Sequence, residues 1–398
     1  MKKHSVVPAG LLAALLALPA AAQDKGFTVG IPLPLTGAEA KFGEMEKQAY
    51  EMAADEVNAR GGVKGHKLAL DIQDSGGKPE TATAIVEKFI TVNKYPIVVG
   101  EYTSQCSYAV AGVAEKYKTP YLVVTGAADK ITQQGWRYVY RLNPPSGLYN
   151  TGIFGFFEAA AKPKSIALLY ENTDFGTSTS KAMKDYCEAK GIQVLLAEGY
   201  QAGAIDFKPI LQKVKSLRPE ILYMVSYLMD ASLLMRQSKE LDLNPQAFIG
   251  GAAGFTLPEF LQNAADASEY VMSGTLWTPQ VKYPGAKEFY EKFKARFGKE
   301  PDYHGAEAYA AVQVLADALK RAKAWTPEDL RTALADTDMM TPFGPVKFVS
   351  WGQFTNQNKL DTLVLQVVKR KFETVWPPEV ASAAFVFPVP RWRDRDRK

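Results

Sequence analysis

Two short polar loops between residues 96 and 131 carry the residue types best suited to holding a small anion or polar head group. Each loop follows an apolar run, PIVVG or YLVVT, and precedes a helical pattern. The first loop contains Tyr102, Thr103, Ser104 and Gln105, and the second contains Thr125, Ala127, Ala128 and Asp129. Hydroxyl groups and unpaired backbone amides at the first turns of two helices suit such a ligand. In the alternative interpretation, the Ser and Thr side chains only cap the helices.

The two apolar runs before these loops indicate how the loops are positioned. Continuous Val, Ile and Leu runs are typical of strands that are covered on both faces, as in a parallel α/β sheet. The carboxyl ends of parallel strands meet at one edge of the sheet, which is where ligands bind in open α/β sheets. We therefore expect both loops to contribute to one site.

From residue 27 onward, strand patterns alternate with helical patterns in two successive runs of five strands. A Pro pair, Pro144 and Pro145, separates the two runs, because it continues neither a strand nor a helix. Such alternation predicts an α/β fold with two lobes, each a parallel sheet flanked by helices. Three chain passages between the lobes, near 143–146, 274–278 and 349–361, permit hinge closure.

The first 22 residues have the layout of a secretory signal peptide. Lys2 and Lys3 precede a short apolar run, and small residues end it before Gln23. A membrane anchor is the alternative, but the run is too short to span a bilayer. We therefore expect a cleaved signal peptide and a soluble, periplasmic protein. The expected division is signal peptide 1–22, first lobe 23–143 plus 278–349, and second lobe 144–277 plus 350–398.

Composition excludes some classes of function. The chain has 47 Lys and Arg against 43 Asp and Glu, and the two signs are interspersed, so no nucleic-acid partner is expected. The final residues RWRDRDRK are expected to be a solvated terminus. Two cysteines, Cys106 and Cys187, are too few for a disulfide framework, and both are expected to be free and partly buried.

Catalysis is not expected from the distribution of histidines and motifs. Beyond the signal peptide the sequence has two histidines, His66 in a Gly-bounded turn and His304 at the start of a long helix. Neither is near a candidate nucleophile in sequence, and zinc-ligand, nucleotide-loop and nucleophile-elbow spacings are absent. Paired carboxylates have no fixed spacing and stay possible. We expect no enzyme activity, no cofactor and no metal.

The order of the sequence motifs resembles the periplasmic solute-binding proteins of the branched-chain amino-acid (Leu/Ile/Val) ABC transporter family. The motifs are PLTG, ALDIQDSGG, VVGEYTSQ, GAADKIT, LYENTDFG, YMVSYLMD, FIGG and VWP, and they cover essentially the whole mature chain. The resemblance implies the class I periplasmic binding fold. It also implies a monomer that captures a small solute by hinge closure and docks on an ABC permease and its ATPase.

The resemblance further implies a set of ligand-binding residues. In the first lobe Ser104 and Ala127 would hold a carboxylate, with Thr103 and Ala128 beside them. In the second lobe Phe175 and Tyr227 would close over the solute. Core packing is the alternative role for these two rings.

Two departures from the family pattern affect the expected solute. Where amino-acid binders place an acidic residue for the ammonium group, this chain has small residues around Ala252. Asp129, which stands where the family has a hydroxyl, could replace that acidic partner or disfavour a ligand carboxylate. Glu101 and Asp174 are further acidic candidates. The expected solute is a branched-chain or other amino acid, or a related carboxylate. The alternatives are an aromatic acid, a short amide or urea, and a role in sensing.

Overall fold

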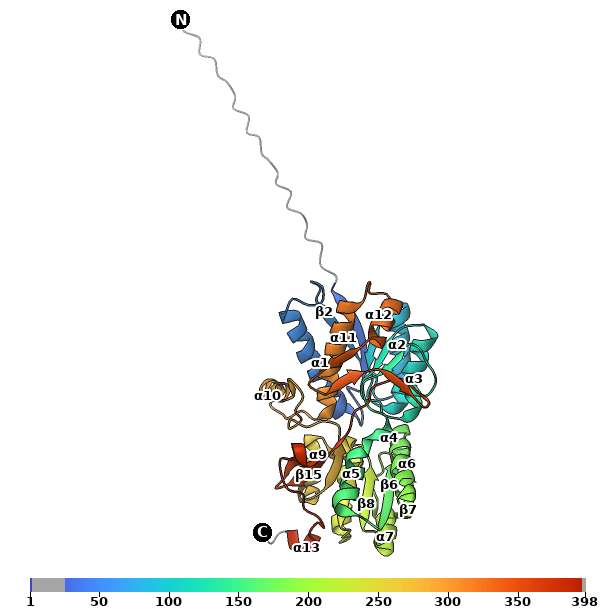
Figure 1. Ribbon diagram of the computed structural model, residues 1–398, viewed down its shortest axis with the longest axis vertical. Helices are drawn as coiled ribbons and strands as arrows, with labels where there is room; N and C mark the ends of the chain where they lie inside the picture. Colours follow the sequence, from blue (N-terminus) through green and yellow to red (C-terminus); the bar gives the residue numbers. More distant parts are fainter. Residues whose placement is uncertain (2–25, 396–398) are drawn as a thin grey trace.

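The computed structural model describes residue 1 and residues 26–395, which form two lobes stacked along the long axis of the molecule (Figure 1). The predicted signal peptide, apart from Met1, lies outside the described residues. Each lobe is built on one seven-stranded sheet with helices packed against it. The predicted fold class, two α/β lobes, is therefore confirmed.

The sheet of the first lobe has the strand order β13-β14-β5-β4-β3-β1-β2. Its strands are β1 (Phe27–Leu33), β2 (Leu68–Asp74), β3 (Val98–Gly100), β4 (Tyr121–Val123), β5 (Val139–Arg141), β13 (Val349–Trp351) and β14 (Phe354–Gln357). Strands β1 to β5 are all parallel, and β3 and β4 are wholly buried. The helices of this lobe are α1 (Ala40–Ala59), α2 (Pro79–Thr91), α3 (Ser104–Lys116), α10 (Ala286–Phe297), α11 (Tyr303–Arg321) and α12 (Pro327–Ala335), with the 3-10 turn η1 (Asp129–Thr132).

The sheet of the second lobe has the order β16-β15-β10-β9-β8-β6-β7. Its strands are β6 (Ser165–Glu171), β7 (Gln193–Tyr200), β8 (Ile221–Val225), β9 (Ala247–Gly250), β10 (Met272–Thr275), β15 (Leu363–Val368) and β16 (Lys371–Trp376). Strands β6 to β10 are parallel, whereas β15 returns antiparallel to β10. The helices are α4 (Ser146–Tyr149), α5 (Thr151–Phe156), α6 (Asp174–Ala189), α7 (Lys208–Leu217), α8 (Leu228–Glu240), α9 (Pro258–Asn263) and α13 (Trp392–Arg395).

The chain passes between the lobes after β5, after β10 and after β14. The third passage begins after Gln357, within the expected range 349–361, but the domain boundary expected at 349/350 does not coincide with it. The sequence analysis placed residues 350–357 in the second lobe, but β13 and β14 form a hairpin that extends the first sheet. This part of the predicted domain boundary is wrong, because Gln357 pairs with Arg141 of β5 in a buried polar network. A small separate hairpin, β11 (Asp338–Met340) with β12 (Pro345–Lys347), precedes it.

The C-terminal segment docks on the second lobe instead of extending into solvent. Trp392 is buried, and its indole Nε1–H donates to the Leu243 carbonyl at 2.7 Å. The Arg395 guanidinium lies 3.5 Å from the Trp392 ring centroid and donates to the Glu269 carbonyl. The expectation of a solvated tail is thus wrong for Trp392 and Arg395, because the aromatic ring and the cation each find a partner on this lobe.

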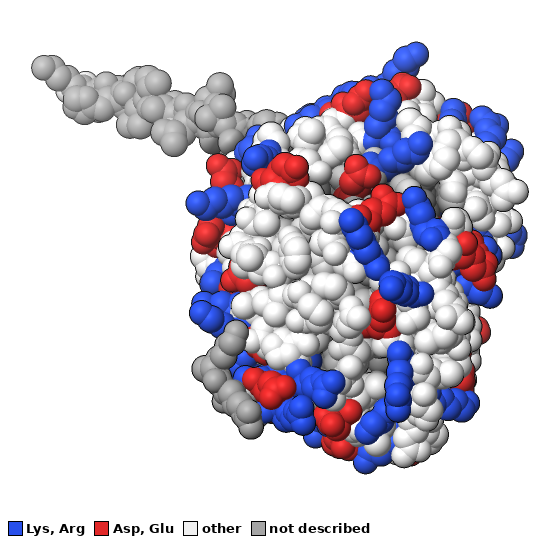
Figure 2. Space-filling model, turned by 60° about the horizontal axis from the view of Figure 1, so that its bottom comes forward, with Lys and Arg blue, Asp and Glu red and all other residues white. Residues whose placement is uncertain are grey.

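Both cysteines, Cys106 in α3 and Cys187 in α6, are unpaired, as expected, and both are fully buried, where partial burial was expected. Among the described helices, none has the length and apolar character that crossing a bilayer requires. The face shown in Figure 2 carries Lys and Arg side chains among Asp and Glu side chains, so this face has no large area of one charge.

Candidate functional site

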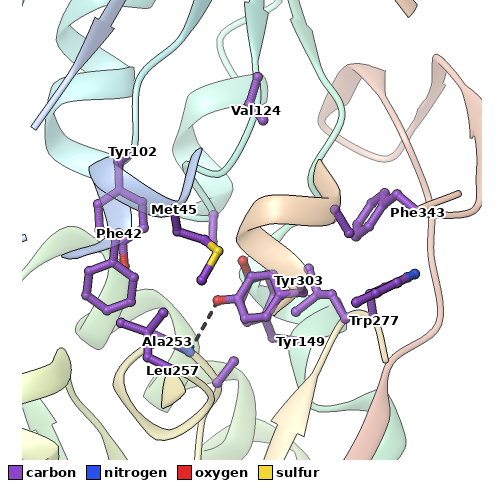
Figure 3. Close-up of a cluster of buried hydrophobic side chains, with 14 of the residues drawn as sticks. Phe42, Met45, Tyr102, Val124, Tyr149, Ala253, Leu257, Trp277, Tyr303 and Phe343 are labelled. Carbon is purple, nitrogen blue, oxygen red and sulfur yellow. Dashed lines mark hydrogen bonds between the residues drawn. The ribbon is translucent and has the colours of Figure 1, made fainter. Parts of the chain in front are cut away.

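A small cavity lies between the two lobes, near the carboxyl ends of the parallel strands. Its lining residues are Tyr102, Ser104, Thr125, Ala127, Tyr303 and His304 from the first lobe, and Tyr149, Phe175, Tyr227 and Ala253 from the second. Figure 3 shows part of this region, where side chains of both lobes pack together. A cavity of this size takes only a small molecule.

Strand-to-helix connections position most of the lining residues. Tyr102 and Ser104 lie between β3 and α3, and Thr125 follows β4. In the second lobe, Phe175 is in the first turn of α6 and Tyr227 immediately precedes α8. The cavity therefore occupies the position that is expected for a ligand site between two parallel sheets.

Ser104 organises the polar end of the cavity. Its Oγ accepts the Ala127 N–H at 3.1 Å and the Ala128 N–H at 3.0 Å. These amides, which the sequence analysis expected to face a ligand directly, are therefore bound to Ser104. The hydroxyl of Ser104 accepts twice, so its own hydrogen is left to donate to a group in the cavity.

Two other predicted site residues, Thr103 and Ala252, have structural roles next to the cavity. Thr103 caps α3, since its side chain accepts the Cys106 N–H at 3.2 Å. Ala252 does not line the cavity, because its N–H donates to Ser273 Oγ at 3.2 Å, and the next residue, Ala253, lines it instead.

Asp129 also lies outside the cavity lining. Its Oδ1 accepts the Gly147 N–H at 3.2 Å, and its own N–H donates to Ser178 Oγ at 3.3 Å. Burial raises the pKa of Asp129, while the Gly147 N–H and the charge of Arg141 oppose that rise. The Asp129 carboxyl group thus holds the chain segment around Gly147, where the chain passes between the lobes. It does not line the cavity and is not placed to pair with a solute ammonium group.

Aromatic rings from both lobes meet across the cleft. Tyr102 stacks on Phe42 with centroids 4.6 Å apart, and Tyr227 stacks on Phe175 at 5.7 Å. The two pairs touch, because Tyr102 and Tyr227 have centroids 5.7 Å apart. The ring of His304 completes the group at 5.4 Å from Tyr102. The predicted residues Tyr102, Phe175 and Tyr227 are therefore brought together.

The cavity lining contains no Asp, Glu, Lys or Arg. Carboxylates lie directly behind it: Glu46 accepts the Thr125 hydroxyl at 2.9 Å, and Glu101 accepts the Tyr102 N–H at 2.6 Å. Burial raises the pKa of Glu46 well above its ordinary value and that of Glu101 to about 7. Asp174, another acidic candidate, pairs with Lys130 across the cleft at 2.8 Å.

Hydrogen bonds join the lobes around the cavity. The Ala253 N–H of the second lobe donates to Tyr303 Oη at 3.2 Å (Figure 3). The Thr256 hydroxyl donates to Asp302 Oδ2 at 2.9 Å. Together with the Lys130–Asp174 ion pair, these bonds hold the two lobes in a closed arrangement.

Sequence reasoning missed Tyr149, Ala253, Tyr303 and His304 as lining residues. Tyr303 and His304 begin α11, a helix that packs along α1 in the first lobe. A usable signal was present: Asp302 immediately precedes this helix and caps it by accepting the His304 N–H. The cap predicts that the helix starts at Tyr303. That this end of the helix faces the cleft follows from the topology of the lobe, which the cap does not indicate.

Two α/β lobes, joined by three passages and closing on a small shared cavity, define a hinged binding protein. The family model for periplasmic binding proteins matches residues 26–371, and the chain belongs to this family.

Among curated relatives, a Leu/Ile/Val-binding protein homolog 8 of Brucella suis is 28% identical over 399 residues, covering 95% of this chain and 96% of the relative. A Leu/Ile/Val-binding protein homolog 7 of Brucella melitensis is 27% identical, covering 98% of this chain and 100% of the relative.

Two solved structures illustrate the shared fold. The substrate-binding protein of a branched-chain amino acid transporter from Streptococcus pneumoniae, in complex with isoleucine, has a TM-score of 0.81 at 22% identity, covering 89% of this chain and 100% of that one. A solute-binding protein from Rhodopseudomonas palustris, in complex with 3,4-dihydroxybenzoic acid, has a TM-score of 0.78 at 20% identity, covering 94% and 99%.

Proposed function

We propose that this chain is the extracytoplasmic substrate-binding component of an ABC importer. It captures a small organic acid between its lobes and delivers it to a permease and its ATPase. The observation that carries this proposal is the cavity lined by residues of both lobes. A solute that contacts both walls binds the closed form more tightly than the open form, and this difference in affinity drives hinge closure.

The proposed solute is a branched-chain amino acid or a related carboxylate. The Ser104 hydroxyl is free to donate to a carboxylate, and the rings of Phe175 and Tyr227 offer an apolar surface to the rest of the molecule. The Leu/Ile/Val-binding names of the curated relatives support the amino-acid assignment.

A second candidate is an aromatic carboxylic acid, and the cavity lining favours it. Five of the ten lining residues are Tyr or Phe. No carboxylate among the lining residues is placed to pair with an ammonium group, and an unpaired buried ammonium is costly. A flat acid without an amine would stack on the rings and leave no charge unpaired.

A thermal-shift screen with calorimetry tests the proposed function. The purified mature protein is mixed separately with leucine, isoleucine, valine, benzoate, 3,4-dihydroxybenzoate, benzamide and urea. Binding of an acid raises the melting temperature, and the rise grows with the logarithm of the ratio of the acid concentration to its Kd. We expect one class of acid to bind and to be recovered chemically unchanged. Conversion of the solute into another compound would contradict the proposal, as would binding of none of these solutes.

We also propose that the protein acts as a periplasmic monomer without enzyme activity, cofactor or nucleic-acid partner. The family supports an extracytoplasmic location. A receptor-docking role in sensing would use the same closed form. Uptake of labelled solute in cells that carry or lack the gene separates the two roles, because only transport depends on the protein for accumulation.

A further inference from the structure

His304 is the lining residue whose chemistry the proposed function has not yet used. Its side chain lies in the first turn of α11, and the residue is 1% exposed. The ring is fixed from several sides. It stacks on Tyr303 at 3.8 Å between centroids and contacts Phe42 at 5.0 Å, edge to face. A ring held so firmly at a cavity wall presents a defined nitrogen to a ligand.

The orientation of the imidazole follows from its hydrogen bond to Asp302. The Nδ1 atom of His304 lies 2.7 Å from Asp302 Oδ2. A carboxylate at Nδ1 fixes a proton on that nitrogen. Nε2 is therefore the ring nitrogen that a molecule in the cavity would meet. Among the lining residues, His304 is the only one whose side chain can carry a positive charge.

Asp302 connects this ring to the opposite lobe. The Oδ2 atom that contacts His304 also accepts the Thr256 hydroxyl of the second lobe at 2.9 Å. The neighbouring Tyr303 hydroxyl accepts the Ala253 N–H of the same lobe. Of these three consecutive residues of the first lobe, Tyr303 and His304 line the cavity, and Asp302 and Tyr303 bind the second lobe.

We propose that His304 binds the carboxylate of the solute through Nε2–H, and that Asp302 links this contact to lobe closure through Thr256. This inference rests on the proposed function and specifies the group that recognises the acid. In the bound form, Nδ1–H donates to Asp302 and Nε2–H donates to the solute carboxylate, and the second ring proton is taken up from solvent as the acid binds. Each carboxylate then receives a charge-assisted hydrogen bond.

The other charged or titratable groups around this ring do not compete for the same contact. The ring faces the side chains of Tyr102 and Tyr303. Glu46 and Glu307 interact electrostatically with Asp302, and burial raises the pKa of both carboxyl groups, which favours their neutral forms. Asp302 is thus the carboxyl group that contacts the His304 ring.

The inference is tested by affinity for matched acids and amides, with leucine against leucinamide and benzoate against benzamide. We expect His304→Gln to weaken binding of the acid at least tenfold and to remove most of the preference for the acid over its amide. Thr256→Val, which keeps the size but removes the hydroxyl, should weaken the acid about fivefold. His66→Gln is the control, since His66 lies in the turn before β2 and packs on Trp325 at 5.1 Å.

A spectroscopic signature separates direct contact from a structural role. In protein labelled with ¹⁵N-histidine, saturation of the wild type with the acid should shift the Nε2 signal of His304 towards the protonated form and leave that of His66 in place. This measurement needs no variant, so it tests the contact between His304 and the acid even if His304→Gln does not fold. In Thr256→Val the same shift should still occur at saturation.

Three outcomes would contradict the inference or its basis. Unchanged acid affinity and acid–amide preference in His304→Gln would remove His304 from the site while leaving the proposed function intact. An unmoved His304 signal at saturating acid would do the same. If the wild type binds neither leucine nor benzoate nor any other acid of the screen, the proposed function itself fails, and the assignment of His304 fails with it.

Discussion

Buried glutamates stand immediately behind the binding cavity. Glu46, Glu101 and Glu171 each accept a hydrogen bond from a residue that lines it, namely Thr125, Tyr102 and Tyr227. A fourth, Glu307, is fully buried, and neither of its carboxylate oxygens has a hydrogen-bond partner among the described residues. Burial raises the pKa of Glu307 well above its ordinary value, and the neighbouring Glu46 adds to the rise.

Replacing Glu307 by Gln should make the stability of the folded protein less sensitive to a rise in pH. A raised pKa in the folded state means that the folded protein binds the proton more tightly than the unfolded chain does. The contribution of Glu307 to the free energy of unfolding is therefore fully present below about pH 4.5. It is lost as pH rises, by up to about 1.4 kcal/mol per pH unit. Melting temperatures measured between pH 5 and pH 8 should fall less in Glu307→Gln than in the wild type.

The exposed residue Glu291 provides the control for this series, since it lies on the solvent side of α10. Glu291→Gln should follow the wild-type dependence on pH. Because Glu46, Glu101 and Glu171 also have raised pKa values, the slope in Glu307→Gln should be reduced and not abolished. An identical pH profile in Glu307→Gln and the wild type would contradict the assignment.

Tyr227 should contribute directly to solute affinity. Its ring joins Phe175 on one lobe to Tyr102 on the other, so truncation removes contact area on both walls of the cavity. We expect Tyr227→Ala to weaken binding by more than tenfold in calorimetry while the protein remains folded. Tyr186→Ala is the matched control, because Tyr186 stacks on Phe154 within the second lobe. Equal affinity of Tyr227→Ala and wild type would exclude Tyr227 from the site.

At the scale of elements, alternation of strands and helices was sufficient to predict the five parallel strands of each lobe. Two buried apolar runs, β3 and β4, also located the loops that build the first wall of the cavity. The sequence pattern failed at β14, whose residues after Phe354, TNQ, are all polar. That strand is held by a buried network in which Gln357 Oε1 accepts from Arg141 Nε at 2.5 Å and from Thr132 Oγ1 at 2.8 Å.

The candidate site was predictable only where a strand leads directly into a loop. Ser104, Phe175 and Tyr227 lie in such loops or in the first turn that follows. Tyr303 and His304 could not be placed in the same way, since α11 follows another helix and no strand. The direction of the Asp129 side chain could not be predicted, because it depends on Gly147, which lies 18 residues further along the chain.

Gly254 controls how closely the turn after β9 approaches the start of α8. A Cβ atom at this position would lie 2.4 Å from the Tyr227 carbonyl carbon, which is backbone and cannot move aside cheaply. Gly254→Ala should therefore displace Tyr227, lower the melting temperature and weaken solute binding. Gly112→Ala, in the interior of α3 with its nearest neighbour at 4.0 Å, should instead stabilise the protein by up to about 1 kcal/mol. Wild-type affinity and stability in Gly254→Ala would contradict this packing argument.

At the scale of the whole molecule, the balance between open and closed lobes decides the apparent affinity. The Lys130–Asp174 pair spans the cleft with side chains 42% and 30% exposed, so it is partly screened. Lys130→Glu places two negative charges face to face and should weaken solute binding a few-fold at low salt. The loss should shrink at about 1 M salt, where the Debye length is about 3 Å.

A charge exchange provides the control for this prediction. The double variant Lys130→Glu with Asp174→Lys restores opposite charges across the cleft. It should recover most of the lost affinity at low salt. Failure of the exchange to recover affinity, or a loss that is independent of salt, would show that the pair does not act by attraction between the lobes.

The two ends of the described chain lie on different lobes. Strand β1 opens the chain in the first lobe, and α13 ends it on the second, where Trp392 anchors it (Figure 1). A fluorescent reporter fused before β1 would thus be attached to the first lobe, and one fused after α13 would be attached to the second. Their energy transfer would follow the bending of the molecule, so the chain is suited to serve as an optical sensor for its own solute.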